Sequence, residues 1–241
     1  MTNSSLFMRQ AFKLDAFMQN FENLFRFMEL KQEPPLKIPS VDYQLLDQTN
    51  DEWLKEGKIE LENVSLAYGE SSKNALKNIS ITIEPKTVIS CVGRASSGKS
   101  SLVAALLNLV KTDSKSKILL DGIDNKSIGT NILRSSIAYI PRETAIFEDS
   151  VKKNLDPLGK IQDHLIWEAL EITGLKNIVE AFPEGLRTVI SKETRLLDVN
   201  QKHLLMLTRA LLRKKSKILI MEDAHSDINT ETEQFIHQTV Q

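Results

Sequence analysis

Glycine is scarce in this sequence. The chain has 241 residues and 9 glycines, whereas an average composition would give about 17. Glycine is the residue that most readily adopts positive φ angles and lets a ligand approach the backbone closely. The positions that keep glycine, and those from which it is missing, therefore indicate where a ligand could come close.

Other absences exclude whole classes of protein. The single cysteine, Cys91, excludes a disulfide framework within the chain and a multi-cysteine metal site, and the four histidines show no metal-ligand spacing. No run of about 18 apolar residues could cross a bilayer, and we expect no secretory signal, because the first ten residues lack a continuous apolar run. The net charge is −1, from 31 basic and 32 acidic residues, so no nucleic-acid partner is expected.

Residues 1–31 carry apolar side chains at helical spacing, which predicts an amphipathic helix. Six of the nine phenylalanines lie in this stretch, and so much aromatic surface needs a partner: another part of the chain, another protein or a membrane surface. Packing against protein is favoured, because the basic polar face of a membrane-surface helix is weak here. Residues 32–56 contain Pro34, Pro35 and Pro39 and fit no regular period, so we expect a linker there.

From Gly57 onward, strand patterns alternate with helical ones. Two short, mostly apolar runs, 87–92 and 217–221, are typical of buried parallel strands. The order predicts an α/β fold with a parallel sheet in its core and an antiparallel β portion near the front. The predicted strands are 58–66, 75–84, 87–92, 117–120, 136–140 and 217–221, and the predicted helices are 99–110 and 201–213, with a mainly helical stretch over 150–178.

The strongest motif is Gly-Arg-Ala-Ser-Ser-Gly-Lys-Ser at residues 93–100, which matches G-x-x-x-x-G-K-[ST] in full. A chance turn is disfavoured, because the motif follows a predicted strand and opens a predicted helix. Its backbone N–H groups and the helix N-terminus can surround a phosphate, Lys99 can contact the β- and γ-phosphates, and the Ser100 hydroxyl can ligate Mg²⁺. The predicted phosphate-binding residues are Gly93, Arg94, Ala95, Ser96, Ser97, Gly98, Lys99, Ser100 and Ser101.

Two acidic residues follow the apolar run 217–221. Glu222 and Asp223 lie at its carboxyl end, which is where ligands bind in parallel sheets. A phosphate loop needs a carboxylate nearby to hold Mg²⁺ and to polarise the attacking water. We therefore predict Glu222 and Asp223 as catalytic residues, and Ser100 and Glu222 as metal ligands. The alternative is a solvated strand end.

These motifs and their order resemble the nucleotide-binding domain of an ATP-binding cassette (ABC) transporter. The resemblance covers residues 52–241 and is strongest to the second such domain of the multidrug-resistance-associated, or C, subfamily. It includes the entry strand 57–68, the segment 137–157, which ends in Asn-Leu-Asp-Pro, and the helix and strand at 204–220. It implies the P-loop NTPase fold of ABC cassettes: a mixed β-sheet core with flanking helices, an antiparallel β subdomain and a helical subdomain.

The resemblance also implies ligands and partners. It implies ATP and Mg²⁺ as cofactors, Tyr68 as the side chain that stacks on adenine, and a head-to-tail dimer with another cassette. Membrane contact would come only through partner transmembrane domains, which places the chain at the cytoplasmic face of a membrane. Residues 1–31 resemble the end of the last transmembrane helix, and residues 57–241 the nucleotide-binding domain. The family's switch histidine would lie shortly after Gln241.

Several positions depart from the family pattern. The Q-loop glutamine is replaced by Arg142, which has donors only and cannot ligate a metal, although it could touch phosphate. The Walker B pair reads Glu222-Asp223 instead of Asp-Glu, and the shorter Asp223 would lie farther from the attacking water. The D-loop aspartate is replaced by Asn229. Glycine is also missing from four positions where the family usually carries it: Lys86, Ser96, Thr194 and Asn200.

The signature motif departs most. The family's Leu-Ser-Val-Gly-Gln would face the γ-phosphate held by the opposite cassette. Asp198 would bring a negative charge there, and like charges at about 4 Å cost on the order of 4 kcal/mol at an effective dielectric near 20. Asp198 is also a good helix N-cap, and both interpretations predict a poor signature. The motif in this chain consists of Leu197, Asp198, Val199, Asn200 and Gln201.

Three hypotheses remain open at this point. The leading one is an ATP-binding cassette of an exporter-type transporter, with weak hydrolysis, that drives or regulates transport. The second is a catalytically inactive cassette that binds ATP as a regulatory or interaction module. The third, an unrelated P-loop kinase or GTPase, is disfavoured by the block 197–220 and by the Asn-Leu-Asp-Pro segment.

Overall fold

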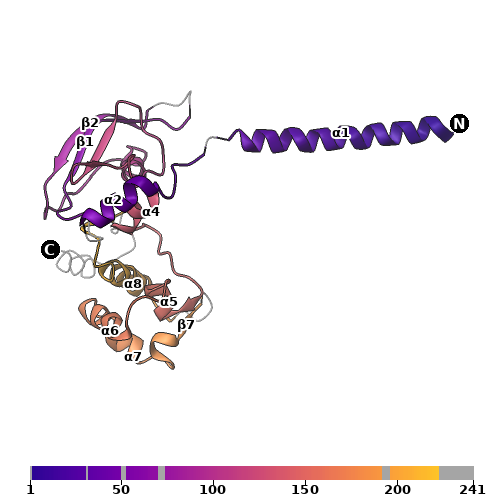
Figure 1. Cartoon of the computed structure of the whole chain (residues 1–241). Helices are drawn as coiled ribbons and strands as arrows, with labels where there is room; N and C mark the ends of the chain where they lie inside the picture. Colours follow the sequence, from indigo (N-terminus) through magenta and orange to yellow (C-terminus); the bar gives the residue numbers. More distant parts are fainter. Residues whose placement is uncertain (1, 31, 50–52, 70–73, 192–195, 223–241) are drawn as a thin grey trace. The chain divides into compact units, whose positions relative to one another are not determined.

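The computed structural model of the chain describes residues 2–30, 32–49, 53–69, 74–191 and 196–222 (Figure 1). It divides into two compact units, residues 1–34 and 35–241. The first unit is built on helix α1 (Thr2–Met28), in agreement with the apolar spacing. Phe21 and Phe25 are exposed on it, and their ring centroids lie 6.1 Å apart. No helix among the described residues is long and apolar enough to cross a membrane.

The second unit differs from the linker expected over residues 32–56. This stretch includes helix α2 (Pro39–Thr49). Proline is tolerated at the first helical position, where its missing N–H has no helical partner to lose, so Pro39 begins a helix instead of preventing one. The buried carboxylate of Asp42 accepts hydrogen bonds from the backbone N–H groups of Ile38, at 2.8 Å, and Gly129, at 2.9 Å.

Residues 53–58 are also tied to the second unit. Trp53 is 4% exposed, and its indole N–H donates to the Ser136 hydroxyl at 2.7 Å. The carboxylate of Asp121 accepts from the backbone N–H groups of residues 55–58 at 2.7–3.2 Å. Burial raises the pKa of Asp121, but these four hydrogen bonds lower it, and the net shift is downward.

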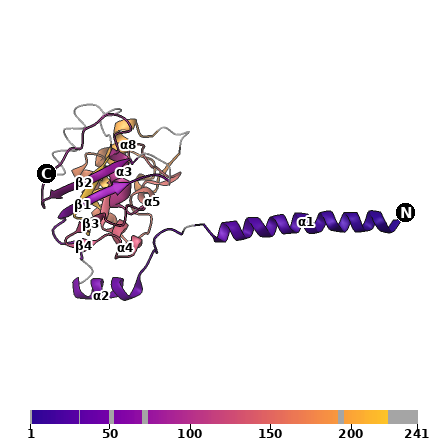
Figure 2. The same ribbon diagram turned by 90° about the horizontal axis from the view of Figure 1, so that it is seen from above.

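Four antiparallel strands form a sheet in the order β2-β1-β3-β4 (Figure 2). The predictions for 58–66, 75–84 and 117–120 are confirmed to within a residue at each end. One face of the sheet packs on helices α3 (Lys99–Leu106) and α4 (Thr130–Ser135) in one apolar cluster, in which Val64, Ile118 and Leu120 are fully buried. The strands are β1 (Ile59–Leu66), β2 (Leu76–Ile83), β3 (Lys117–Leu120) and β4 (Ile123–Asp124).

Two strands pair in parallel, as the predicted core requires. They are β5 (Ile137–Ile140) and β8 (Ile218–Met221), with Ile137 opposite Ile218. The pairing continues one residue beyond β8, where the N–H of Glu222 donates to the carbonyl of Ile140 at 3.0 Å. This places Glu222 at the carboxyl end of the pair.

The predicted buried strand at 87–92 is wrong. The structure has no strand there, and Val88, Ile89 and Val92 are 60%, 50% and 92% exposed. A parallel strand is held by hydrogen bonds to neighbouring strands, and none of the described strands pairs with this segment. An apolar run therefore indicates that a segment suits a buried strand, but not which strand it pairs with.

The remaining described helices pack in a second apolar cluster around Leu170, Leu175 and Leu205. The predicted helical stretch 150–178 is confirmed as three helices, and the helix predicted at 201–213 begins two residues earlier. The helices are α5 (Val151–Leu155), α6 (Asp163–Ile172), α7 (Lys176–Glu180) and α8 (Val199–Leu211), and with them lie a 3₁₀ turn (Gly185–Arg187) and the antiparallel pair β6 (Asp149–Ser150) and β7 (Val189–Ile190).

The Asn-Leu-Asp-Pro segment holds this helical part together. Asn154 is fully buried, and its amide donates to the carbonyls of Phe147, Asp149 and Ser150 at 2.9–3.2 Å. Arg209 of α8 donates to the Asn154 carbonyl at 2.6 Å and lies over the Phe147 ring, 5.4 Å from its centroid. Asn154 therefore links the segment before α5 to helix α8.

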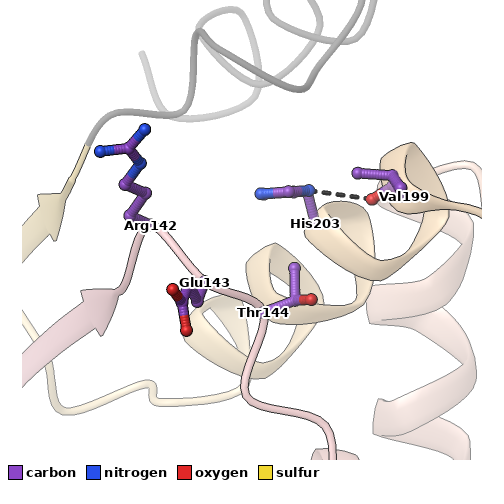
Figure 3. A pocket seen from close by; sticks show the side chains of 5 residues that line it. All are labelled: Arg142, Glu143, Thr144, Val199 and His203. Atoms are coloured by element: carbon purple, nitrogen blue, oxygen red, sulfur yellow. Dashed lines mark hydrogen bonds between the residues drawn. The ribbon is translucent and has the colours of Figure 1, made fainter. Parts of the chain in front are cut away.

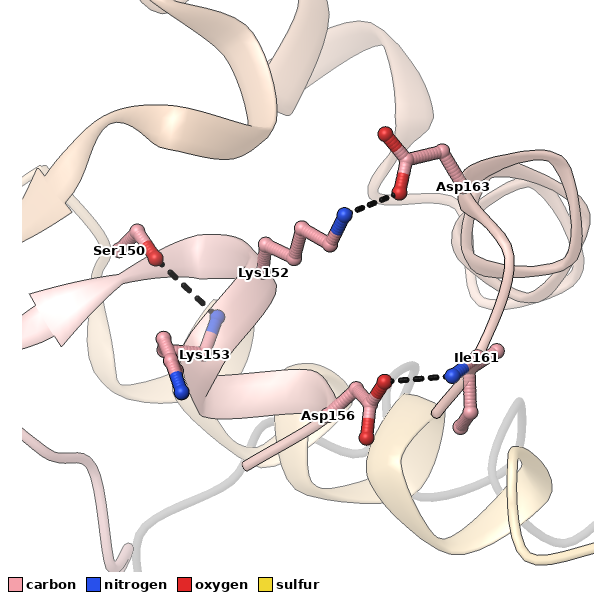
Figure 4. Close-up of polar contacts among 6 residues, drawn as sticks. All are labelled: Ser150, Lys152, Lys153, Asp156, Ile161 and Asp163. Carbon is pink, nitrogen blue, oxygen red and sulfur yellow. Dashed lines mark hydrogen bonds and ion pairs between the residues drawn. The ribbon is translucent and has the colours of Figure 1, made fainter. Parts of the chain in front are cut away.

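Figure 4 shows the polar contacts that fix the ends of α5. Ser150 caps the helix by accepting from the N–H of Lys153 at 3.1 Å. After the helix, the carboxylate of Asp156 accepts from the N–H of Ile161 at 2.6 Å. Lys152 forms an ion pair with Asp163 at the start of α6. The motif residues Asn154 and Asp156 thus satisfy backbone groups of their own loops.

Candidate functional site

The phosphate loop, residues 93–100, leads into helix α3, which begins at Lys99 as predicted. Gly98 has φ +98°, and a Cβ there would lie 2.6 Å from the carbonyl oxygen of Ala75. A Cβ on Gly93 would lie 2.7 Å from the Ser97 hydroxyl oxygen. The positive φ and the backbone contact therefore require glycine at position 98, whereas a Cβ at position 93 would need the flexible Ser97 side chain to move.

Lys99 lies folded over its own loop. Its ammonium group donates to the carbonyl oxygens of Gly93, at 2.7 Å, and Arg94, at 3.1 Å. These contacts place the cation at the centre of the turn formed by residues 93–98. The side chains of Arg94, Ala95 and Ser97 are exposed around it.

Two of the positions that lack glycine keep a glycine-like backbone. Ser96 inside the loop has φ 62°, and Lys86 in the turn before it has φ 57°. Non-glycine residues rarely adopt this left-handed region, which costs roughly 1–2 kcal/mol. At these two positions the residue is not the family's glycine, but the backbone has the positive φ that glycine adopts most easily. Thr194 lies outside the described residues, and Asn200 lies within helix α8.

Tyr68 follows strand β1 and lies beside the loop. It is about half exposed, and its hydroxyl donates to the Ser101 hydroxyl in α3 at 3.2 Å. An exposed aromatic ring near a phosphate loop offers a flat face on which a base can stack. The structure therefore places Tyr68 against the first turn of α3, and its stacking on adenine stays a prediction.

The oxygen donors predicted to hold Mg²⁺ are the Ser100 hydroxyl, in the first turn of α3, and the Glu222 carboxylate, directly after β8. Mg²⁺ is usually bound through one or two protein groups together with nucleotide phosphates. Among the described residues, no group of three or more His, Cys, Asp or Glu side chains could hold a metal unaided. A hydroxyl and a carboxylate are oxygen ligands that Mg²⁺ accepts beside nucleotide phosphates, and no hydrogen bond among the described residues joins Ser100 to Glu222. Asp223, the other predicted catalytic residue, and Asn229 lie outside the described residues.

Glu222 has a partner that the sequence did not reveal. The hydroxyl of Tyr139, on β5, donates to Oε2 of Glu222 at 2.9 Å. Burial, together with the hydrogen bond to Glu222 and its charge, raises the pKa of Tyr139 to about 12. The phenol is therefore protonated at neutral pH and acts as the donor.

The signature residues begin helix α8. The Asp198 carboxylate accepts from the N–H of Gln201 at 2.7 Å, and the Gln201 side chain accepts from the N–H of Asp198 at 3.0 Å. This reciprocal pair is a capping box, so the interpretation of Asp198 as a helix cap is confirmed. Leu197 is buried, whereas Val199 is half exposed.

Arg142 lies beside the same helix start. With Glu143, Thr144, Val199 and His203 it lines an open pocket of about 420 Å³ (Figure 3). Within the described residues, no hydrogen bond joins Arg142 to the phosphate loop. Nδ1 of His203 lies 2.9 Å from the Val199 carbonyl oxygen, which only accepts, so Nδ1 carries the proton. Sequence reasoning missed this pocket, because it depends on the packing of residues 142–144 against α8.

A comparison with family models decides the relationship. The model described as "ABC transporter" matches residues 76–226, more than half of the chain. The chain belongs to the ABC transporter family. The mixed α/β fold, with its antiparallel sheet, parallel strand pair and helical part, is consistent with an ABC cassette.

The relatives are C-subfamily ABC proteins. ABC transporter C family member 1 of Dictyostelium discoideum is 40% identical over 188 residues, which cover 78% of this chain and 14% of that protein. The vacuolar heme ABC transmembrane exporter abc3 of Schizosaccharomyces pombe is 33% identical, over 91% of this chain and 14% of the exporter. The metal resistance protein YCF1 of Saccharomyces cerevisiae is 31% identical, over 96% of this chain and 15% of YCF1. The chain therefore spans about 14% of the length of the first of these relatives.

Family membership gives the general chemistry. An ABC ATP-binding domain implies ATP as its ligand, usually with Mg²⁺. The family is one of ATPases, and such cassettes act together with membrane domains.

Proposed function

We propose that this chain is the ATP-binding cassette of an exporter-type ABC transporter and that it drives or regulates transport from the cytoplasmic face of a membrane. The main support for this proposal is the phosphate loop, with Lys99 at its centre and Tyr68 beside it. The names of the relatives, among them a transmembrane exporter and a metal resistance protein, support the transport role. Membrane contact would come through partner transmembrane domains.

The residues of the loop have distinct parts in binding ATP. Lys99 exchanges its two carbonyl partners for the β- and γ-phosphate oxygens, and the N–H groups at the start of α3 add further donors. Tyr68 stacks on the adenine. Ser100 and Glu222 would hold Mg²⁺, which neutralises charge on the phosphate oxygens when it is bound. The exposed loop residues, including Ser101 and Arg94, border the phosphates.

Hydrolysis by this cassette is proposed to be weak. Arg142 has no acceptor to offer a metal or a water molecule, and it lines the pocket beside α8. The carboxylate of Asp198 would face the γ-phosphate of a second cassette in a head-to-tail dimer and repel it. The alternative is a catalytically inactive regulatory cassette that binds ATP without turnover. The capping box supports this alternative as well, because it holds Asp198 at the helix end.

The test of ATP binding is the substitution Lys99→Ala. We expect the affinity for ATP to fall at least about 100-fold, because two charge-assisted hydrogen bonds to phosphate are lost. Calorimetric titration with ATP measures it. The matched control is Lys111→Ala, an exposed lysine beyond α3, which should leave the affinity unchanged. Equal affinity in Lys99→Ala and the parent chain would refute the assignment of the loop.

Phosphate release separates the two forms of the proposal. Slow but measurable release of phosphate from bound ATP supports a weakly hydrolysing cassette. ATP binding without any release, in the presence of a partner cassette, supports the regulatory module.

A further inference from the structure

The contact between Tyr139 and Glu222 joins two neighbouring parallel strands at the candidate metal ligand. Tyr139 lies opposite Ile220 in the ladder, and Glu222 follows two residues later. The 2.9 Å hydrogen bond engages Oε2. Among the described side chains, only Tyr139 donates to this carboxylate, and the bond does not engage Oε1.

We propose that Tyr139 is a positioning residue for Mg²⁺: its hydroxyl holds the Glu222 carboxylate so that the free oxygen can ligate the metal that accompanies ATP. The inference rests on the proposed function, since it concerns the same nucleotide site. Tyr139 itself touches neither metal nor nucleotide.

The length of Glu222 explains why such a partner is needed. The family pattern has an aspartate at this position, and glutamate has one more rotatable bond. A carboxylate on a longer side chain samples more orientations, and each must be restricted before it can ligate a metal. A hydrogen bond to the second oxygen restricts these orientations in advance, and metal-ligating carboxylates are commonly held by such hydrogen bonds.

The chemistry of the donor suits this task. A lysine or arginine in the same place would form an ion pair and reduce the attraction of Glu222 for a cation. The neutral phenol donates one hydrogen bond and leaves the negative charge of the carboxylate in place. The backbone supports the geometry, because the N–H of Glu222 is bonded to the Ile140 carbonyl of the same strand as Tyr139.

The substitution Tyr139→Phe tests the proposal, because it removes the hydroxyl and keeps the ring. ATP affinity of the whole chain is measured in EDTA and at increasing MgCl₂. We expect the affinity in EDTA to stay within about twofold of the parent, and the Mg²⁺ concentration for half-maximal tightening to rise about tenfold. Tyr43→Phe, which alters an exposed tyrosine on α2, is the matched control and should change neither value.

A second pair of variants shows whether the effect passes through Glu222. In Glu222→Asp the carboxylate is one methylene shorter and farther from the hydroxyl of Tyr139. Tyr139→Phe should then change the Mg²⁺ requirement by less than about twofold. A tenfold change in both backgrounds would mean that Tyr139 acts elsewhere, and this would overturn the proposal.

A measurement that leaves Tyr139 and Glu222 unchanged guards against a Tyr139→Phe variant that fails to fold. Tyrosines labelled at the ring carbon that bears the hydroxyl give three resonances, and Tyr43→Phe and Tyr68→Phe leave that of Tyr139 by elimination. It should shift when Mg²⁺ is added to the ATP complex. No shift, or an unchanged Mg²⁺ requirement in Tyr139→Phe, overturns this inference alone. A parent chain that does not bind ATP overturns the proposed function, and the inference falls with it.

Discussion

Asp198 suits the start of helix α8 but not a phosphate-binding surface. As the N-cap of α8 it satisfies a backbone N–H that the helix leaves without a partner. In a head-to-tail dimer the same carboxylate would face phosphate. A residue chosen only for the cap could be serine, which also accepts this bond.

The substitution Asp198→Ser therefore keeps a helix cap and removes the negative charge. We expect the free energy of unfolding to change by less than about 0.5 kcal/mol, because serine is a comparable cap, whereas Asp198→Ala should lose about 1 kcal/mol. Chemical denaturation measures both. If Asp198→Ala is as stable as the parent chain, the capping box contributes nothing.

A pH effect follows from Asp121. Its pKa is lower in the folded chain than the ordinary value of 3.8, so its ionised form stabilises the fold above that value, and this contribution disappears as the pH falls through the lowered pKa. The parent should lose stability more steeply than Asp121→Asn between about pH 5 and that point. Asparagine suits the comparison because it tolerates the left-handed φ of 47°. Parallel pH profiles in urea unfolding would count against the four-bond arrangement.

At the scale of elements, residues 87–92 offer the clearest test of structure against sequence. The apolar pattern predicts a buried strand, whereas the structure leaves Cys91 exposed. Since it is the only cysteine, a maleimide reagent reports on this segment alone. We expect native protein to be labelled nearly as fast as unfolded protein. Labelling slowed more than about a hundredfold by folding would favour the buried strand.

How far the sequence predicted the elements depended on the range of the interactions that form them. The loop at 93–100 is specified by neighbouring residues, and it leads into a helix where the sequence placed it. Pairing within a sheet joins residues that are far apart in the sequence, so the sequence of residues 87–92 alone could not show that this segment is exposed. The same holds for the bond between Tyr139 and Glu222, which are 83 positions apart.

At the scale of the whole molecule, the boundary between the units matters more than the expected linker. Residues 1–34 form their own unit, while residues 35–56 supply α2 and the buried Trp53 to the second. A chain lacking residues 1–34 should therefore melt within about 2 °C of the parent. Removal of residues 1–56 should lower the melting temperature by at least about 10 °C, since burial of a tryptophan and the adjacent buried Leu54 is lost. Calorimetry of both truncations measures this, and equal melting would restore the linker interpretation.

The hydrogen bonds of Lys99 to its own loop also influence which anions can bind there. An anion must displace two carbonyl oxygens from the ammonium group before it gains a full contact. Chloride offers one charge and no fixed arrangement of oxygens, so it gains little from this exchange. A triphosphate brings several negative oxygens that also reach the N–H groups at the start of α3. We therefore expect this competition to favour polyphosphates over the abundant small anions of the cell.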